Sequence, residues 1–149
     1  MSAAEAPRAV LFACTSNMIR SPMAAALMQL RFGSLVHVES VGIRPGGEMD
    51  PLAAIVVDEV GGEIPKRRPK GFDALDEDAR FDLIVSLSPE AHHRALNLVP
   101  ALAEAAEYWP TFDPSLAEGS RDQRLEEYRL VRNGLDQRIS QRFPQSPTG

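Results

Sequence analysis

The chain has 149 residues, 44% hydrophobic and 25% charged, which is the composition of a soluble globular domain with its own core. Its formal net charge of −5 argues against general binding to nucleic acid. No stretch is apolar enough to span a bilayer, so we expect neither nucleic acid nor a membrane as a partner. The sequence carries no signal for a particular oligomeric state.

Cysteine usage and the first residues indicate the compartment. Cys14 is the single cysteine of the chain, so no internal disulfide can form and a reducing environment fits best. Residues 1–7 lack the basic region and the apolar run of a signal peptide. We therefore expect a cytoplasmic protein.

Strand-like and helix-like segments alternate along the chain. Residues 8–14 favour a buried strand, and the alanine-rich residues 21–32 favour a helix. The last segment has apolar residues three or four positions apart, which form one face of a helix: Leu125, Tyr128, Val131, Leu135, Ile139 and Phe143. In chain order the expected elements are strand 8–14, helix 21–32, strand 36–43, helix 51–60, strand 81–88, helix 89–98, strand 106–109 and helix 121–143.

This alternation predicts the fold class. Strands separated by helices imply a parallel sheet with right-handed crossovers. We expect a single-domain α/β fold over residues 8–143, in which a central four-stranded parallel sheet is flanked by helices in three layers. Residues 1–7 and 144–149 are expected to be flexible tails. Ligands bind beyond the carboxyl ends of the strands in such sheets, which directs attention to the loop after the first strand.

That loop carries the most informative motif of the chain. Five residues separate Cys14 from Arg20 between strand and helix, and Ser21 follows directly. Backbone N–H groups and a helix N-terminus converge at such a turn and bind anions. A thiolate there can attack a bound oxyanion, and an arginine can hold that oxyanion with two parallel hydrogen bonds. The alternative for Cys14 is a small buried core residue.

The remaining loop residues suit the same chemistry. The Ser21 hydroxyl can donate to the Cys14 sulfur, and Pro22 fits the first helical turn because it needs no N–H partner there. Asn17 tolerates the left-handed backbone that a tight anion loop often needs. We therefore predict a phosphate-binding loop after the first strand, with anion contacts from Thr15, Ser16, Asn17, Met18, Ile19 and Ser21.

Residues 14–24, Cys-Thr-Ser-Asn-Met-Ile-Arg-Ser-Pro-Met-Ala, resemble the signature of the low-molecular-weight protein tyrosine phosphatases and their arsenate reductase relatives. The pattern of that family is Cys-x-Gly-Asn-x-x-Arg-Ser, and the likeness extends over residues 8–143. It implies Cys14 as the nucleophile and Arg20 as the anion clamp. The sequence has no metal-ligand spacing and the loop itself supplies a positive field, so we expect neither a metal nor a cofactor.

The resemblance also implies roles for residues outside the loop. The family places its general acid in an Asp-Pro after the last strand, which here is Asp113-Pro114. A serine at the end of the second strand braces the loop asparagine, and Ser40 matches that position. Taken alone, Asp-Pro is a common start of a turn, and Ser40 is a small residue at a strand end.

The chain departs from the family pattern in several places. Ser16 replaces the loop glycine, and no second cysteine is present to protect the nucleophile as a disulfide. A histidine that often braces the asparagine is replaced near Arg68. Ser115 stands where many tyrosine-specific members carry an aromatic residue beside the substrate ring. The last departure predicts weak selectivity for phosphotyrosine.

A short basic segment contains both lysines of the chain. Lys66 and Lys70 flank Arg67 and Arg68. One interpretation is a solvated loop before the next element. The other is electrostatic attraction of an anionic substrate to an otherwise acidic protein.

Three functions are compatible with these residues. The first is a cysteine-dependent phosphomonoesterase of the tyrosine phosphatase type, acting on a phosphorylated protein or a small phosphate ester through a cysteinyl-phosphate. The second is an arsenate reductase that uses an external small thiol, because this chain has Ser88 where relatives carry a relay cysteine. The third is a phosphate-binding regulator with low turnover, which the intact Cys14, Arg20, Ser21 and Asp113 disfavour.

Overall fold

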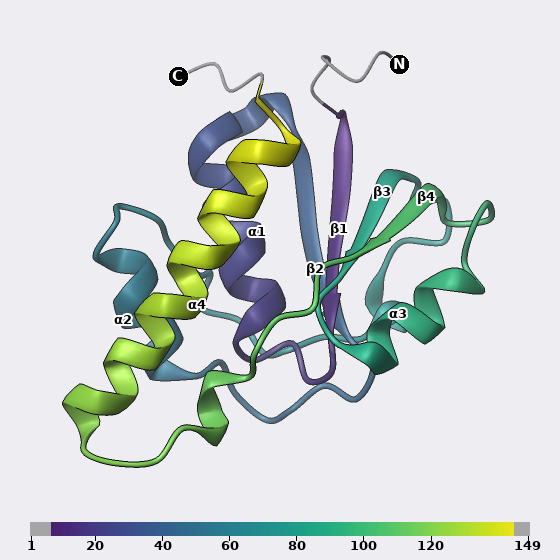
Figure 1. Ribbon diagram of the computed structural model, residues 1–149. Helices are drawn as coiled ribbons and strands as arrows, with labels where there is room; N and C mark the ends of the chain where they lie inside the picture. Colours follow the sequence, from purple (N-terminus) through teal and green to yellow (C-terminus); the bar gives the residue numbers. More distant parts are fainter. Residues whose placement is uncertain (1–6, 145–149) are drawn as a thin grey trace.

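The computed structural model describes residues 7–144, which form one four-stranded parallel sheet with helices on both faces (Figure 1). The strands lie in the order β2-β1-β3-β4. The predicted α/β class and parallel sheet are therefore confirmed, while the predicted tails lie almost wholly outside the described residues. The strands are β1 (Ala9–Cys14), β2 (His37–Gly42), β3 (Phe81–Ser86) and β4 (Ala103–Tyr108).

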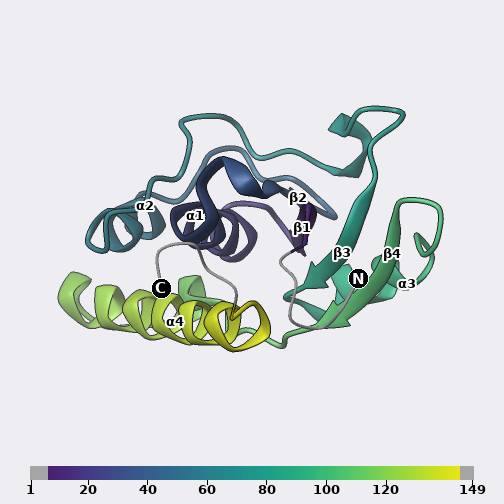
Figure 2. The ribbon, with the colours of Figure 1, turned by 90° about the horizontal axis from the view of Figure 1, so that it is seen from above.

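The helices form the two outer layers. One face of the sheet carries three helices and the other carries α3, as the view from above shows (Figure 2). None of the helices within residues 7–144 is both long and apolar enough to cross a membrane. The α-helices are α1 (Arg20–Phe32), α2 (Pro51–Asp58), α3 (Pro89–Leu96) and α4 (Arg121–Arg142), and the short 3₁₀ turns are η1 (Gly33–Leu35), η2 (Phe72–Ala74) and η3 (Pro114–Leu116).

The central position of β1 explains its apolar sequence. A strand covered on both faces has no solvent-facing side, so apolar residues run without alternation. Phe12 points into the core between the sheet and the layer of α1, α2 and α4, whereas Leu11 points into the core under α3. Both side chains are fully buried. This strand fixes the position of the loop that follows it.

The edge strand β4 starts three residues before its predicted beginning. Its sequence, Ala-Glu-Ala-Ala-Glu-Tyr, mixes small and charged residues, and most of them are exposed or half-buried. An edge strand pairs on one side only and tolerates such residues. The hydrophobic pattern therefore predicted only the last part of β4, from residue 106 onward. Two helices also end two residues earlier than predicted, α2 at Asp58 and α3 at Leu96.

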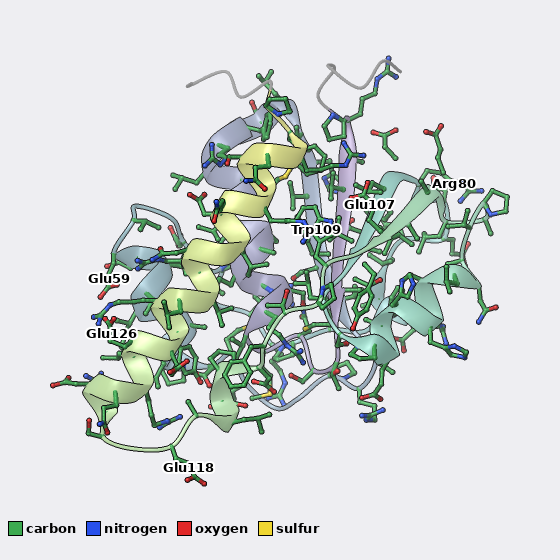
Figure 3. The ribbon with its side chains drawn as sticks, viewed as in Figure 1. Glu59, Arg80, Glu107, Trp109, Glu118 and Glu126 are labelled. Atoms are coloured by element: carbon green, nitrogen blue, oxygen red, sulfur yellow. The ribbon has the colours of Figure 1, made fainter. Side chains whose placement is uncertain are left out.

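The last helix is tied to the sheet through the chain that leaves β4. The Trp109 indole packs edge-on against Phe12 at 6.0 Å and donates to Glu107 Oε1 at 3.0 Å. Arg142, at the end of α4, donates to Glu107 Oε2 at 2.7 Å. Figure 3 labels Glu107 and Trp109 over the strands, to the right of α4 in this view. These contacts hold the start of the segment that leads to Asp113.

Candidate active site

The loop between β1 and α1 lies at the carboxyl edge of the sheet, together with the segments that leave β2, β3 and β4 (Figure 1). The parallel register places Cys14 opposite Gly42 and Phe12 opposite Ser40. The topology thus brings residues from three strand ends around the Cys14 sulfur. This is the edge at which parallel α/β sheets bind ligands.

The backbone of the loop is turned so that its carbonyl groups face away from the centre. Four of them accept hydrogen bonds from the chain that follows β2, which runs alongside the loop. Where the carbonyl groups point out of the loop, the neighbouring N–H groups can point into it. Several such N–H groups together form an anion-binding concavity. The four carbonyl–amide pairs are Cys14–Ile43, Thr15–Arg44, Ser16–Gly46 and Met18–Asp50, with O···N distances of 2.8–3.1 Å.

The helix that follows adds to the same field. No side chain caps the N-terminus of α1 at Ile19, and the first turn carries no acidic residue. Its first amide groups are therefore not neutralised by a carboxylate, and the helix dipole favours negative charge there. The side chain of Ile19 itself is buried in the core, so its contribution to anion binding is limited to its backbone.

The Cys14 sulfur lies at the base of the loop with two polar partners. It is 1% exposed, accepts from the Asn17 N–H at 3.2 Å, and lies 2.9 Å from Ser21 Oγ. The Ser21 hydroxyl is also 3.2 Å from the Val41 carbonyl. A neutral thiol can donate to Ser21 while Ser21 donates to Val41, and a thiolate can accept the Ser21 proton instead. The same atoms therefore accommodate both protonation states of the sulfur.

Asn17 is the buried centre of the network behind the sulfur. Its side-chain amide donates to Ser21 Oγ and to Ser40 Oγ, each at 2.9 Å. Its Oδ1 accepts from the Lys70 N–H at 2.9 Å and from Arg67 Nη1 at 3.2 Å. The pairing of Asn17 with Ser40 that the resemblance implied is thus present. All hydrogen-bonding atoms of this fully buried side chain have partners.

Two residues explain how the backbone reaches this shape. Among the described residues, Asn17 is the one non-glycine residue with a positive φ, 57°. Ser16 therefore does not need the freedom of the glycine that it replaces. Gly42, in contrast, permits a close approach, because a Cβ atom there would lie 2.7 Å from the Asn17 nitrogen. The sequence reasoning did not identify Gly42, since a glycine at a strand end is usually a turn residue.

Asp50 supports the loop from the α2 side. Its N–H donates to the Met18 carbonyl at 3.1 Å, and its carboxylate caps α2 by accepting from the Leu52 N–H at 2.8 Å. The other carboxylate oxygen accepts from the Tyr128 hydroxyl at 2.9 Å. Burial and this hydrogen bond to Asp50 raise the pKa of Tyr128. One aspartate thereby joins the loop to both α2 and α4.

Arg20 connects the anion loop to the loop that carries Asp113. Its Nη1 donates to the Thr111 carbonyl at 3.0 Å, and its Nη2 lies 4.0 Å from Asp113 Oδ2. Asp113 Oδ1 accepts from both the N–H and the hydroxyl of Ser115, at 3.0 and 2.7 Å. The predicted acid therefore lies beside the predicted clamp. The Asp113 side chain is 32% exposed, which leaves it accessible from solvent.

Thr15 and Met18 line the loop at its sides. The Thr15 hydroxyl donates to Ser88 Oγ at 3.1 Å, so Ser88 lies directly beside the loop. The half-buried Met18 lies over Gly46, where a Cβ atom would come within 2.1 Å of its sulfur. Within residues 7–144, no group of three His, Cys, Asp or Glu side chains is arranged to hold a metal ion.

The basic segment contributes one residue that the sequence did not single out. Sequence reasoning placed the substitute for the bracing histidine near Arg68, but it is Arg67 that turns inward and bonds Asn17 and Ser40, whereas Arg68 is exposed. In a run of four cations, the residue types alone do not tell which side chain faces the loop. The parallel bridge between Gly71 and Gly42 and the bond from the Lys70 N–H to Asn17 Oδ1 hold this segment beside the loop.

Comparison with known proteins identifies the family. Residues 9–143 match the model of the low molecular weight phosphotyrosine protein phosphatases. The chain belongs to this family. The match covers all four strands and reaches beyond the end of α4.

Relatives with several activities share this family fold. The chain is 41% identical over 103 residues to a protein-arginine-phosphatase of Geobacillus stearothermophilus, covering 62% of this chain and 70% of the relative. It is 32% identical over 124 residues to a low molecular weight protein-tyrosine-phosphatase of Streptomyces coelicolor, covering 76% and 74%. A solved structure of an arsenate reductase in its phosphate-binding state superposes with a TM-score of 0.71 at 26% identity, covering 90% and 95%.

Proposed function

We propose that this protein is a cysteine-dependent phosphomonoesterase of the tyrosine phosphatase type. The observation that carries the proposal is the Cys14 sulfur, which accepts from the Asn17 N–H and lies 2.9 Å from Ser21 Oγ, at the base of a loop whose carbonyl groups are held outward. Such a loop binds a tetrahedral oxyanion next to a nucleophile. Its substrates are phosphorylated proteins or small phosphate esters, and the single cysteine favours a cytoplasmic location.

In the first step the Cys14 thiolate attacks phosphorus. The loop N–H groups and the Arg20 guanidinium hold the equatorial oxygens, where charge is concentrated in the transition state. Asp113 donates a proton to the leaving oxygen, which departs as an alcohol. The product of this step is a cysteinyl-phosphate. Arg20 directly follows the anion loop in the chain, and its guanidinium lies 4.0 Å from the acid.

In the second step water releases phosphate. Asp113, now deprotonated, accepts a proton from the attacking water, so one carboxyl group alternates between acid and base. The Cys14 sulfur leaves as a thiolate, and the Ser21 hydroxyl at 2.9 Å is in place to donate to it. Loop amides, the helix N-terminus and Arg20 supply the positive field, so we propose that turnover proceeds without a metal or cofactor.

The second candidate is arsenate reduction with an external thiol, and the likeness to an arsenate reductase structure favours keeping it. Cys14 would displace one oxygen of arsenate to form a sulfur–arsenic bond. A small thiol would attack that sulfur, releasing arsenite and leaving a mixed disulfide, and a second thiol would restore Cys14. Ser88 beside Thr15 offers no thiol for an internal relay.

The two candidates are separated by assaying one preparation on two substrates. We expect p-nitrophenyl phosphate hydrolysis by the native protein that is unaffected by chelator and competitively inhibited by phosphate. Cys14→Ser should abolish turnover while still binding phosphate. In parallel, arsenate is offered with glutathione or with thioredoxin, and no thioredoxin-linked turnover is expected. Undiminished hydrolysis by Cys14→Ser would sink the mechanism, and efficient arsenate reduction without esterase activity would favour the second candidate.

A further inference from the structure

We propose that Arg67 is a positioning residue for the catalytic loop, and that its guanidinium holds Asn17 in the conformation that directs hydrogen bonds at the Cys14 sulfur. The inference rests on the proposed function for its meaning in catalysis. It concerns a residue outside the Cys14–Arg20 motif.

The guanidinium of Arg67 bridges the loop and β2. Its Nη1 donates to Asn17 Oδ1 at 3.2 Å and to the Arg68 carbonyl at 2.8 Å. Its Nη2 donates to Ser40 Oγ at 3.1 Å and lies 3.4 Å from the Ser40 carbonyl. One planar fork therefore fixes two residues that are already bonded to each other. A lysine cannot reproduce this pattern, because its single ammonium group lacks the fork.

From Asn17, two routes lead to the sulfur. The first passes through the side chain: Asn17 donates to Ser21 Oγ at 2.9 Å, and Ser21 lies 2.9 Å from the Cys14 sulfur. The second is the backbone N–H of Asn17, which donates to the sulfur at 3.2 Å. Asn17 has a positive φ of 57°, a left-handed conformation that asparagine tolerates and that its hydrogen-bond partners select. Arg67 is one of the groups that fix it.

The charge of Arg67 acts on the carboxylate of Glu39 as well as on this network. Within residues 7–144, no carboxylate lies within ion-pair distance of Arg67. The nearby Glu39 is instead bonded to Lys70 and His37, each at 2.8 Å. Burial alone would raise the pKa of Glu39, but these two hydrogen bonds lower it overall. Burial lowers the pKa of Arg67, yet an arginine stays charged at neutral pH.

Other charged groups lie around the loop, and the test must separate them from Arg67. Arg20 lies at the start of α1, and its Nη2 is 4.0 Å from Asp113 Oδ2. Glu90 on α3 interacts electrostatically with Arg20 and pairs with Arg44 at 2.6 Å. None of these groups bonds Asn17. A change at Arg67 therefore alters the Asn17 network and leaves the contacts of Arg20 with Thr111 and Asp113 intact.

The experiment measures the pH dependence of Cys14 alkylation by iodoacetamide, which reports this sulfur alone because the chain has no other cysteine. Arg67→Gln should move the midpoint of that profile up by about one pH unit, the scale expected for loss of a nearby charge and its hydrogen bonds. It should also lower kcat/KM for p-nitrophenyl phosphate by about tenfold. Arg67→Lys keeps the charge without the fork and should move the midpoint by a smaller amount.

The matched control is Arg68→Gln, which removes the same charge from the neighbouring exposed side chain. We expect its alkylation profile to equal that of the native protein. Ser40→Ala combined with Arg67→Gln should show less than additive effects, because both act through Asn17. If Arg67→Gln does not fold, the Arg67→Lys variant carries the test, and an unshifted profile there overturns the proposal.

Two outcomes separate this inference from the proposed function. Equal alkylation profiles for Arg67→Gln and Arg68→Gln, in a protein that hydrolyses p-nitrophenyl phosphate, would overturn the role of Arg67 alone. A shifted profile for Arg67→Gln, in a protein without esterase activity, would support the role of Arg67 and refute the phosphatase. Alkylation needs no turnover, so the two results are independent.

Discussion

The two halves of the site are held in very different ways. The loop that contains Cys14 is bonded along its whole length, with its carbonyls tied to the chain after β2 and Asn17 completely buried. The loop that contains Asp113 lies at the surface, and the bonds to its carboxylate come from Ser115, two residues away. Arg20 joins the halves through the Thr111 carbonyl.

This difference matches the tasks that the halves perform. A bound phosphoryl group has one shape, so preorganised donors that cost no rearrangement serve it best. Leaving groups differ in size and basicity, so an exposed acid on a short turn can meet more than one of them. We infer that damage to the Asp113 half depends on the leaving group, whereas damage to the Cys14 half affects all substrates alike.

Among the changes that compare the two halves, the largest effect is expected from Asp113→Asn, which removes the proton donor and keeps the shape. Turnover should fall by about 10²–10⁴, the usual scale for acid–base assistance. The loss should be greatest for alkyl phosphates, whose leaving oxygens need the proton most, and smallest for aryl phosphates with acidic phenols. The measurement is kcat/KM over a series of leaving groups of graded basicity.

Asp78→Asn is the control for this series, since it removes a carboxylate from an exposed position before β3. It should leave every rate unchanged. An equal loss for Asp113→Asn across the whole series would contradict the assignment of Asp113 as the acid, and with it the contrast between the halves.

Gly42→Ala tests the Cys14 half of the site. Its effect on turnover should lie between those of Asp113→Asn and Ser115→Tyr. The added Cβ would lie 2.7 Å from the Asn17 nitrogen and 2.8 Å from the Ser16 carbonyl carbon, both of them backbone atoms that cannot turn aside. Displacing this backbone should lower kcat/KM by up to about 10². Overpacking should also lower the free energy of unfolding by about 1–3 kcal/mol.

The control is Gly47→Ala, because a Cβ at Gly47 would meet nothing within 4 Å. Rates are compared for an aryl and an alkyl phosphate, and stability by thermal unfolding. The rate loss in Gly42→Ala should be the same for both substrates. A loss confined to one of them would mean that the Cys14 loop also senses the leaving group.

The sequence predicted those parts of the site whose residues lie close together in the chain. Cys14, Arg20 and Ser21 lie within eight consecutive residues between an apolar strand and a helix, so their proximity needed no tertiary information. The parallel sheet followed from the alternation of strand and helix patterns. The apolar run of residues 9–13 predicted a buried strand, and β1 is buried over nearly its whole length.

The supporting residues could not be predicted in the same way, because they become neighbours only in the folded chain. Arg67 lies 50 residues after Asn17, and nothing in its local sequence distinguishes it from Arg68. Gly42 is required because its strand passes directly behind the loop. Strand β4 has no apolar run, since an edge strand tolerates small and charged residues.

The smallest effect is expected at Ser115, where an aromatic wall for phosphotyrosine is lacking. Ser115→Tyr should raise kcat/KM for a phosphotyrosine peptide but not for a small alkyl phosphate. Ring stacking is worth about 0.5–1.5 kcal/mol, or roughly a 2- to 12-fold gain. Ser115→Ala is the matched variant, because both changes remove the hydroxyl that bonds Asp113 and keep the backbone N–H. The gain is therefore measured against Ser115→Ala, which isolates the ring from the lost hydrogen bond. If Ser115→Tyr and Ser115→Ala hydrolyse the peptide equally well, the loop that contains Asp113 does not contact the substrate ring at this position.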